Sequence, residues 1–137
     1  MIVVDTNVLS DLTKPNRSDG LESWFATEPE VVVVSAVTLA EIDMGIAIMP
    51  AGARREMTAF AMRAIVDDSL EGVVIPFDRA AAEQYGPVVA ARRAAGRPIS
   101  IADAQIAAIC RARGATLATR NVRDFEHTGI TVFDPSS

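Results

Sequence analysis

Four acidic residues stand beside apolar segments of this chain with few cations near them, and they are the side chains best suited to carry chemistry. They are Asp5, Glu41, Asp103 and Asp124. Asp5 directly follows the β-branched run Ile2 to Val4, which reads as a buried strand. Carboxylates without an accompanying His or Cys are hard oxygen ligands, and they favour Mg²⁺ or Mn²⁺ over zinc. We therefore expect these four acids to bind a divalent metal.

Two of the acids lie at helix starts, where a structural role is the alternative. Asp5-Thr-Asn7 supplies three residue types that cap a following helix. Asp103 is the third residue after Ser100, which is the spacing of a capping box. Capping and metal binding are compatible, so neither alternative excludes the metal site.

The other two acids also have ordinary structural readings. Glu41 on a helix has apolar or small neighbours on its own face, but it is also consistent with an exposed glutamate at the edge of an apolar stripe. Asp124 follows a strand, and it is also consistent with an ion pair to Arg120 or Arg123. His127 lies near Asp124 without another histidine and reads as a surface loop residue.

The elements that must position these acids alternate between short β-branched runs and longer Ala-rich segments. This alternation is typical of a parallel sheet covered by helices, so the fold class is α/β. We expect strands at Ile2 to Val4, Val31 to Val34, Val73 to Phe77, Thr116 to Ala118 and Ile130 to Phe133. We expect helices at Asn7 to Leu12, Gly20 to Ala26, Thr38 to Ile48, Ala53 to Asp68, Arg79 to Ala95 and Ile101 to Arg113. Asp5 and Asp124 then follow strands, and Glu41 and Asp103 lie early in helices at the same sheet edge.

Glycine and proline positions support these boundaries, with one conflict. Gly114 suits a helix C-terminus, whereas Pro87 inside the fifth helical segment lacks a backbone donor. We expect that helix to kink or divide near Gly86. No repeat or linker interrupts residues 1–137, which are expected to form a single domain.

Length, charge and cysteine content restrict the class of protein. The 137 residues include 13 Lys plus Arg and 18 Asp plus Glu, for a net charge of -5, which argues against nucleic-acid binding unless a metal neutralises clustered acids. Cys110 is the single cysteine and lies among apolar and small residues, so we expect a buried thiol in a reducing compartment. No leader-like or membrane-length apolar run is present, and we expect a cytoplasmic protein.

Four sequence blocks carry a resemblance to a known family. They are Val4-Asp-Thr-Asn-Val-Leu-Ser10, Ser35-Ala-Val-Thr-Leu-Ala-Glu-Ile42, Gly96-Arg-Pro-Ile-Ser-Ile-Ala-Asp-Ala-Gln-Ile-Ala-Ala108 and Leu117-Ala-Thr-Arg-Asn-Val-Arg-Asp-Phe125. The chain resembles PIN-domain ribonucleases, and most of all the VapC and FitB toxins of bacterial type II toxin–antitoxin modules. The blocks span nearly the whole chain in family order.

The resemblance implies a three-layer α/β/α fold with a central, mostly parallel sheet of four to five strands. It also implies hydrolysis of RNA phosphodiester bonds with Mg²⁺ or Mn²⁺ held by Asp5, Glu41, Asp103 and a fourth acid. In many relatives that fourth acid aligns with Asn121 of this chain, and in others it aligns with Asp124. Only the second position carries a carboxylate here.

The sequence also suggests residues that orient the four acids and residues that contact a partner protein. Thr6, Asn7 and Thr119 are expected to orient the carboxylates, with Asn121 and Arg120 as further supporting or substrate contacts. The resemblance further implies a cognate antitoxin, operator DNA bound only through that antitoxin, and a homodimer. The partner-binding candidates on one helical face are Leu21, Trp24 and Phe25, for which a core role is the alternative.

Two other functions stay open on the sequence. A catalytically weak domain that mainly binds an antitoxin or DNA is suggested by the neutral Asn121. An aspartyl-phosphate phosphotransferase also places an Asp after its first strand, although Asn7 stands where a second Asp is usual in such enzymes.

Overall fold

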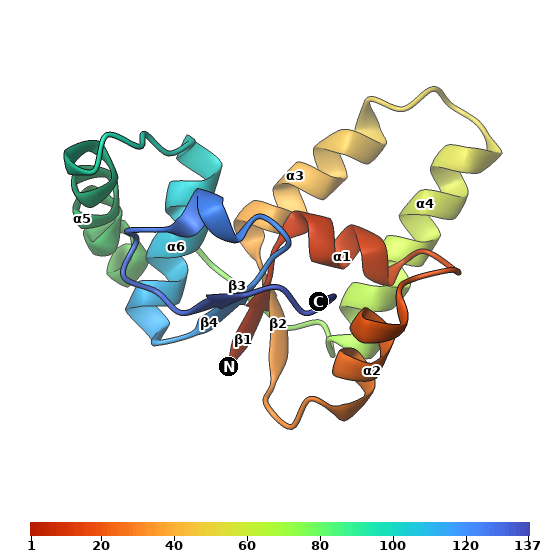
Figure 1. The fold of residues 1–137 in the computed structure, drawn as a ribbon. Coiled ribbons are helices and arrows are strands. Elements are labelled where there is room, and N and C mark those ends of the chain that lie inside the picture. The colour runs from red at the N-terminus through yellow and green to blue at the C-terminus, as the bar shows by residue number, and fades with distance from the viewer.

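The computed structural model describes all 137 residues, and its centre is a five-stranded sheet in which every strand is parallel (Figure 1). The strand order is β3-β2-β1-β4-β5, so the first strand of the chain lies in the middle. Val3 of β1 pairs with Val33 on one side and Leu117 on the other. The strands are β1 (Ile2–Val4), β2 (Val32–Ser35), β3 (Val74–Ile75), β4 (Thr116–Ala118) and β5 (Val132–Phe133).

Helices cover both faces of the sheet. They are α1 (Thr6–Leu12), α2 (Asp19–Thr27), α3 (Ala36–Ala47), α4 (Ala53–Ala64), α5 (Arg79–Ala94) and α6 (Ile101–Arg113), with a π-helical turn η1 (Ile65–Ser69) and a 3-10 turn η2 (Val122–Phe125). Successive side chains of β1 point to opposite faces, so Val3 packs in a core with α5 and α6 while Ile2 and Val4 pack with α1 and α4. The expected three-layer α/β/α fold is confirmed.

The observed boundaries agree with the expected ones within about two residues, apart from the end of the fourth helical segment. There, α4 ends at Ala64 and continues as the π-helical turn η1, because the hydrogen bond from Leu70 N–H reaches back to Ile65 O. Sequence periodicity does not distinguish such a turn from an ordinary helix. Gly114 has the expected left-handed conformation, with φ of 61°, at the C-terminus of α6.

The expectation that α5 divides near Gly86 is wrong. One helix runs from Arg79 to Ala94 with Pro87 inside it. Pro87 removes the donor for the carbonyl of Glu83, but both residues are exposed, so water can hydrate that carbonyl. Gly86 has no Cβ to meet the proline ring, which removes the usual steric conflict before a proline.

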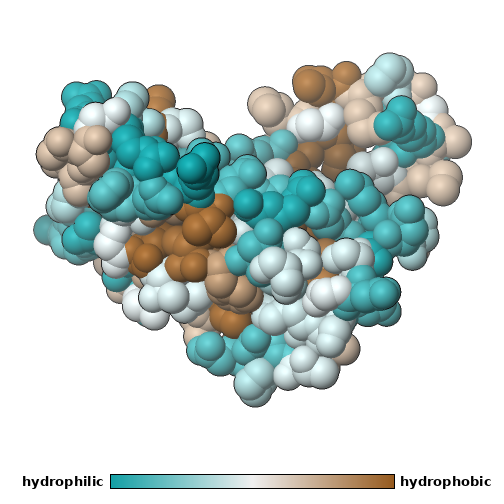
Figure 2. All heavy atoms as spheres, viewed as in Figure 1, coloured by the Kyte–Doolittle hydropathy of each residue, from teal (hydrophilic) through white to brown (hydrophobic).

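The molecule has a notch above the carboxyl ends of the central strands. In Figure 1, α5 and α6 stand on one side of the strand ends and α3 and α4 extend away on the other. Figure 2 shows this notch between two lobes, with hydrophilic side chains gathered at its foot. Helices α1, α3 and α6 all begin near this edge, so the fold brings their first residues together.

Candidate active site

Asp5 lies at the carboxyl end of β1 and is only 5% exposed. Its side chain caps α1 by accepting a hydrogen bond from Thr6 N–H at 2.8 Å through Oδ1. Its second oxygen, Oδ2, accepts a bond from the hydroxyl of Thr119 at 2.8 Å and a longer one from the Asn7 amide at 3.4 Å. The capping role expected as an alternative is therefore real, and the same carboxylate also faces a polar network.

Thr119 is the hub of that network. Its buried hydroxyl donates to Asp5 and accepts from the Asn7 side chain at 3.2 Å and from the Asn121 N–H at 3.1 Å. The side-chain oxygen Oδ1 of Asn7 in turn accepts from the Arg120 N–H at 3.0 Å. These bonds join the end of β1 to the loop after β4, so the orientation of Asp5 depends on residues from both ends of the chain.

Glu41 is a half-buried residue on the second turn of α3. Its Oε1 accepts a hydrogen bond from the Thr6 hydroxyl at 2.9 Å, which links α3 to the start of α1. Helix α3 begins here because Ser35 ends β2 and caps the Thr38 N–H at 3.1 Å. Thr6 therefore contacts both neighbouring acids, through its backbone for Asp5 and through its side chain for Glu41.

Asp103 is a half-buried residue in the first turn of α6. The Ser100 hydroxyl accepts from the Asp103 N–H at 3.2 Å, as the capping spacing predicts. This cap places the Asp103 carboxylate at the N-terminal end of α6, close enough to the other acids for their charges to affect its ionisation.

Asp124 lies in η2 and Asn121 directly precedes that turn, and both are exposed. The Asp124 N–H bonds the Asn121 carbonyl at 3.0 Å, so one turn separates the two side chains. Asn121 joins the network around Asp5 through its backbone N–H. Asp124 acts through its charge, which raises the pKa of both Asp5 and Asp103.

The four carboxylates form a region of uncompensated negative charge. Burial raises the pKa of Asp5, and the charge of Asp124 adds to that effect against the hydrogen bonds from Thr119 and Thr6, which lower it. Burial first, and then the charges of Asp5, Asp124 and Glu41, raise the pKa of Asp103 to about 6. No Lys or Arg forms an ion pair with any of the four.

This donor set fits a hard divalent cation in chemistry, since it offers carboxylate oxygens that no cation of the protein neutralises. The four carboxylates are not yet close enough to one another to coordinate a single ion. No group of three or more acidic, His or Cys side chains in the structure is arranged closely enough to do so. Direct coordination by all four acids would need side-chain rotation, for which the exposed Asp124 and the half-buried Glu41 have room.

The remaining residues singled out by sequence lie in different settings. Arg120 pairs through Nε with Asp11 of α1 at 3.1 Å, with half of its side chain exposed. His127 is exposed in a loop with a positive φ of 63°. Cys110 is buried in the core, where desolvation raises the pKa of the thiol to about 12.

The three partner-binding candidates on α2 divide by burial. Leu21 is 2% exposed and packs in the core beside α1, so the alternative core role applies to it. Trp24 and Phe25 are half-buried, with Trp24 packed edge-on against Phe133 and bonded through its indole N–H to Glu28 at 2.8 Å. Only these two retain surface for another molecule.

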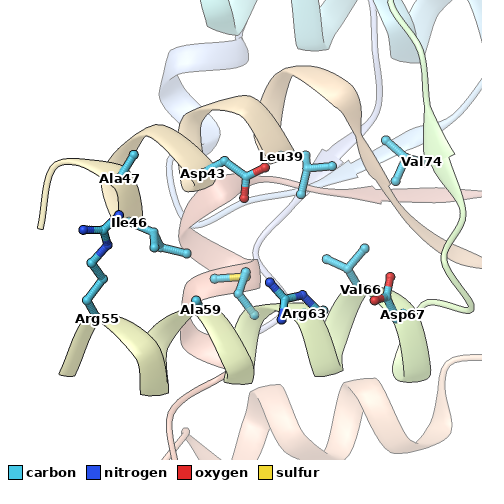
Figure 3. Close-up of a pocket in the computed structure, with 11 residues that line it drawn as sticks. Leu39, Asp43, Ile46, Ala47, Arg55, Ala59, Arg63, Val66, Asp67 and Val74 are labelled. Carbon is cyan, nitrogen blue, oxygen red and sulfur yellow. The ribbon is translucent and has the colours of Figure 1, made fainter. Parts of the chain in front are cut away.

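A cavity of about 500 Å³ lies elsewhere, between α3 and α4 (Figure 3). Its lining includes Leu39, Ile46 and Val66, and none of the four acids contributes to it. The chemistry suggested by the carboxylates is therefore separate from this cavity.

Comparison with known proteins matches residues 2–130 to the family described as the PIN domain. The chain belongs to the PIN-domain family. A similar PIN protein is the "VapC ribonuclease Y4jK" of Sinorhizobium fredii, which is 38% identical over 98% of this chain and 97% of its own length. "Toxin FitB" of Neisseria gonorrhoeae is 29% identical over 98% of each chain. Among solved structures, "Structure of FitAB bound to IR36 DNA fragment" matches with a TM-score of 0.89 and 30% identity, covering 100% of this chain and 96% of the other.

Proposed function

We propose that this PIN-domain protein is a metal-dependent endoribonuclease and the toxin of a toxin–antitoxin module. The observation that carries the proposal is the buried Asp5 carboxylate, surrounded by the charges of three further acids without a cation partner. The names of similar proteins support the activity and its setting, since one is called a VapC ribonuclease and another a toxin.

The residues that would hold a metal are Asp5, Asp103, Glu41 and Asp124. Their oxygen ligands suit Mg²⁺ or Mn²⁺. When bound, such an ion lowers the pKa of water and stabilises negative charge on the oxygens of a phosphodiester under attack. No side-chain nucleophile is required.

The protein's own residues prepare the carboxylates for this role. The Thr6 N–H bonds Oδ1 of Asp5, and the Thr119 hydroxyl and the Asn7 amide bond Oδ2, which fixes the plane of the carboxylate and leaves a lone pair on Oδ1. The Thr6 hydroxyl holds Oε1 of Glu41, and its Oε2 stays available to bind metal or to accept a proton from water.

Substrate selection in this proposal depends on the shape and backbone of RNA. Aromatic residues make up only 5% of the chain, so few bases can stack on the protein. Arg120 is half exposed beside the network and is the nearest candidate for a phosphate contact, although its pairing with Asp11 competes with that role.

The proposed partners follow from the similar proteins. A cognate antitoxin is expected to cover part of the surface near Trp24 and Phe25, and operator DNA is expected to bind through that antitoxin. A homodimer is the expected state of the toxin itself. None of the helices combines the length and the apolar character that spanning a membrane requires. Because the proposed substrate is RNA, we propose the cytoplasm as the place of the activity.

RNA cleavage by the purified protein tests the proposal. We expect cleavage with Mg²⁺ or Mn²⁺, none with EDTA, and a loss of at least about 100-fold in Asp5→Asn, in which asparagine still caps α1. The matched control is Asp43→Asn, which removes an exposed acid of α3 and should leave the rate unchanged. Cleavage by Asp5→Asn at the wild-type rate would refute the assignment. Absence of both metal binding and RNA cleavage in the wild type would instead favour a domain that only binds partners.

A further inference from the structure

Arg92, in the last turn of α5, is a buried cation without an acidic partner. Its residue exposure is 5%, and no carboxylate pairs with it. The guanidinium instead donates to three backbone carbonyls. Nη1 bonds the oxygens of Glu126 at 2.8 Å and Arg123 at 3.4 Å, and Nη2 bonds the oxygen of Pro98 at 3.4 Å.

Those carbonyls belong to the two segments that carry acids of the candidate site. Arg123 and Glu126 stand on either side of Asp124 at the C-terminal end of η2, where a positive charge is favourable. Pro98 precedes Ser100, the residue that caps α6 beside Asp103. One planar guanidinium therefore holds both segments relative to each other and to α5.

Other bonds strengthen the same junction. The Arg97 N–H bonds the carbonyl of Arg92 at 2.9 Å, and the Arg97 side chain pairs with Glu126. On the other side of η2, the buried Thr128 hydroxyl donates to the Phe125 carbonyl at 2.6 Å. The turn that carries Asp124 is thus fixed at its C-terminal end, with Arg92 as its buried contact from α5.

Stability alone does not account for a charge at this place. A buried guanidinium without a carboxylate costs desolvation energy, and Arg92 Nε has no hydrogen-bond partner in the protein. An apolar side chain would fill the position without leaving a buried donor unpaired, although all three carbonyls would lose the guanidinium, and only that of Arg123 would keep another donor, the Glu126 N–H. What arginine adds is a rigid fork that reaches all three carbonyls at once.

We infer that Arg92 is a positioning residue for the acidic site: by bonding the carbonyls of Arg123, Glu126 and Pro98, it fixes the turn bearing Asp124 and the loop leading to Asp103. The inference deepens the proposed function and rests on it. Arg92 acts here through backbone geometry, because its guanidinium bonds three carbonyls and pairs with none of the acids.

The test compares Arg92→Gln and Arg92→Lys with Arg93→Gln, a matched control at the next, exposed residue of α5. We expect Arg92→Gln to weaken Mn²⁺ binding about tenfold by calorimetry and to lower kcat for RNA cleavage about tenfold, with little change in KM. Arg92→Lys keeps the charge but not the fork and should recover part of the loss. Arg93→Gln should behave as wild type.

A combination with Asp124→Asn separates positioning from a general loss of stability. If Arg92 acts through Asp124, Arg92→Gln weakens Mn²⁺ binding clearly less in the Asp124→Asn background than in the wild type. Equal losses in both backgrounds, or wild-type Mn²⁺ affinity in folded Arg92→Gln, would overturn the inference. If Arg92→Gln does not fold, the same comparison is made with Arg92→Lys, and wild-type affinity in that variant overturns the inference as well.

Hydrogen exchange distinguishes failure of this inference from failure of the proposed function. The Asp124 and Glu126 amides, both hydrogen-bonded within the turn, should exchange faster in the Arg92 variants than in Arg93→Gln, whether or not the protein cleaves RNA. Unchanged exchange at both amides argues against positioning. A wild type without RNase activity but with faster exchange in the variants contradicts only the proposed function.

Discussion

At the scale of single residues, the candidate site is a set of carboxylates oriented by hydrogen bonds, in which burial and then neighbouring acids raise the pKa of Asp5 and Asp103. The sequence alone pointed to these four acids, because Asp5 and Asp124 follow strands while Glu41 and Asp103 lie early in helices. The bonds that orient them were predictable only in part, since the Thr6–Glu41 and Thr119–Asp5 pairs are separated by 35 and 114 residues. Arg92 was not predictable, because its neighbour Arg93 looks equivalent in sequence.

Removal of one acid should stabilise the metal-free protein. The folded-state pKa of Asp103 is raised from 3.8 to about 6, so the folded protein binds the proton more tightly than the unfolded chain. Stability should therefore fall as the pH rises through this window, with the full penalty above it. Because solvent screens this half-exposed carboxylate, we expect Asp103→Asn to raise the free energy of unfolding by only about 1 kcal/mol at pH 7, and to have little effect at a pH below 3.8.

Urea unfolding in EDTA, at pH 7 and at a pH below 3.8, measures the difference in free energy of unfolding between Asp103→Asn and the wild type. Asp43→Asn, which removes an exposed acid, serves as the control and should change stability little at either pH. If Asp103→Asn is less stable than the wild type at pH 7, the ionised Asp103 carboxylate makes net favourable interactions in the folded protein. Repulsion among the acids would then not be the dominant effect.

At the scale of elements, sequence patterns located every α-helix and strand but neither the 3-10 turn η2 nor the spatial order of the strands. The Val-rich runs and the serine caps are local signals, whereas the order β3-β2-β1-β4-β5 depends on crossover connections that no local pattern specifies. The π-helical turn η1 and the uninterrupted α5 are the two places where local rules misjudge the element. In α5, exposure of Glu83 and the missing Cβ of Gly86 accommodate the proline.

A coupled pair of substitutions in α5 tests that account. Pro87→Ala restores a donor for the Glu83 carbonyl and should stabilise the protein by on the order of 1 kcal/mol. Gly86→Ala alone should not stabilise it, although a Cβ there meets open space, because alanine before proline disfavours the helical conformation. In the Pro87→Ala background the same change should add about 0.5 to 1 kcal/mol.

Chemical denaturation of Pro87→Ala, Gly86→Ala and the double variant gives their free energies of unfolding. The difference between the double variant and the sum of the single changes is the coupling energy between the two positions. Gly45→Ala, at a glycine of α3 that also faces open space and precedes no proline, is the control and should stabilise by the ordinary amount. Additive effects of the two α5 substitutions would show that Gly86 does not relieve a conflict with Pro87.

At the scale of the whole molecule, metal binding and folding should be linked. A divalent ion that binds the folded protein alone stabilises it by about 2.7 kcal/mol when its free concentration is roughly 100 times the dissociation constant. For a domain of this size that corresponds to a rise in Tm of roughly 8 to 10 °C. We expect Mn²⁺ to produce such a rise in the wild type and in Asp43→Asn, but not in Asp5→Asn.

Differential scanning calorimetry with Mn²⁺ and with EDTA makes this measurement, with K⁺ at matched ionic strength to separate binding from charge screening. If Mn²⁺ raised the Tm of Asp5→Asn as much as that of the wild type, the metal would bind at a site that does not include Asp5.

Because β1 is the central strand, the acidic site at its end can assemble only when later parts of the chain have been synthesised. Asp5 is synthesised long before its supports, because the strand on one side of β1 and the hydroxyl that holds Asp5 arrive only with residues 116–119. A nascent chain that has reached α6 already contains Asp5, Glu41 and Asp103 but lacks the residues that orient Asp5 and bring in Asp124. The acidic site is therefore completed only after residues 116–124 have been synthesised, and a shorter nascent chain holds three of the four acids without the residues that assemble them.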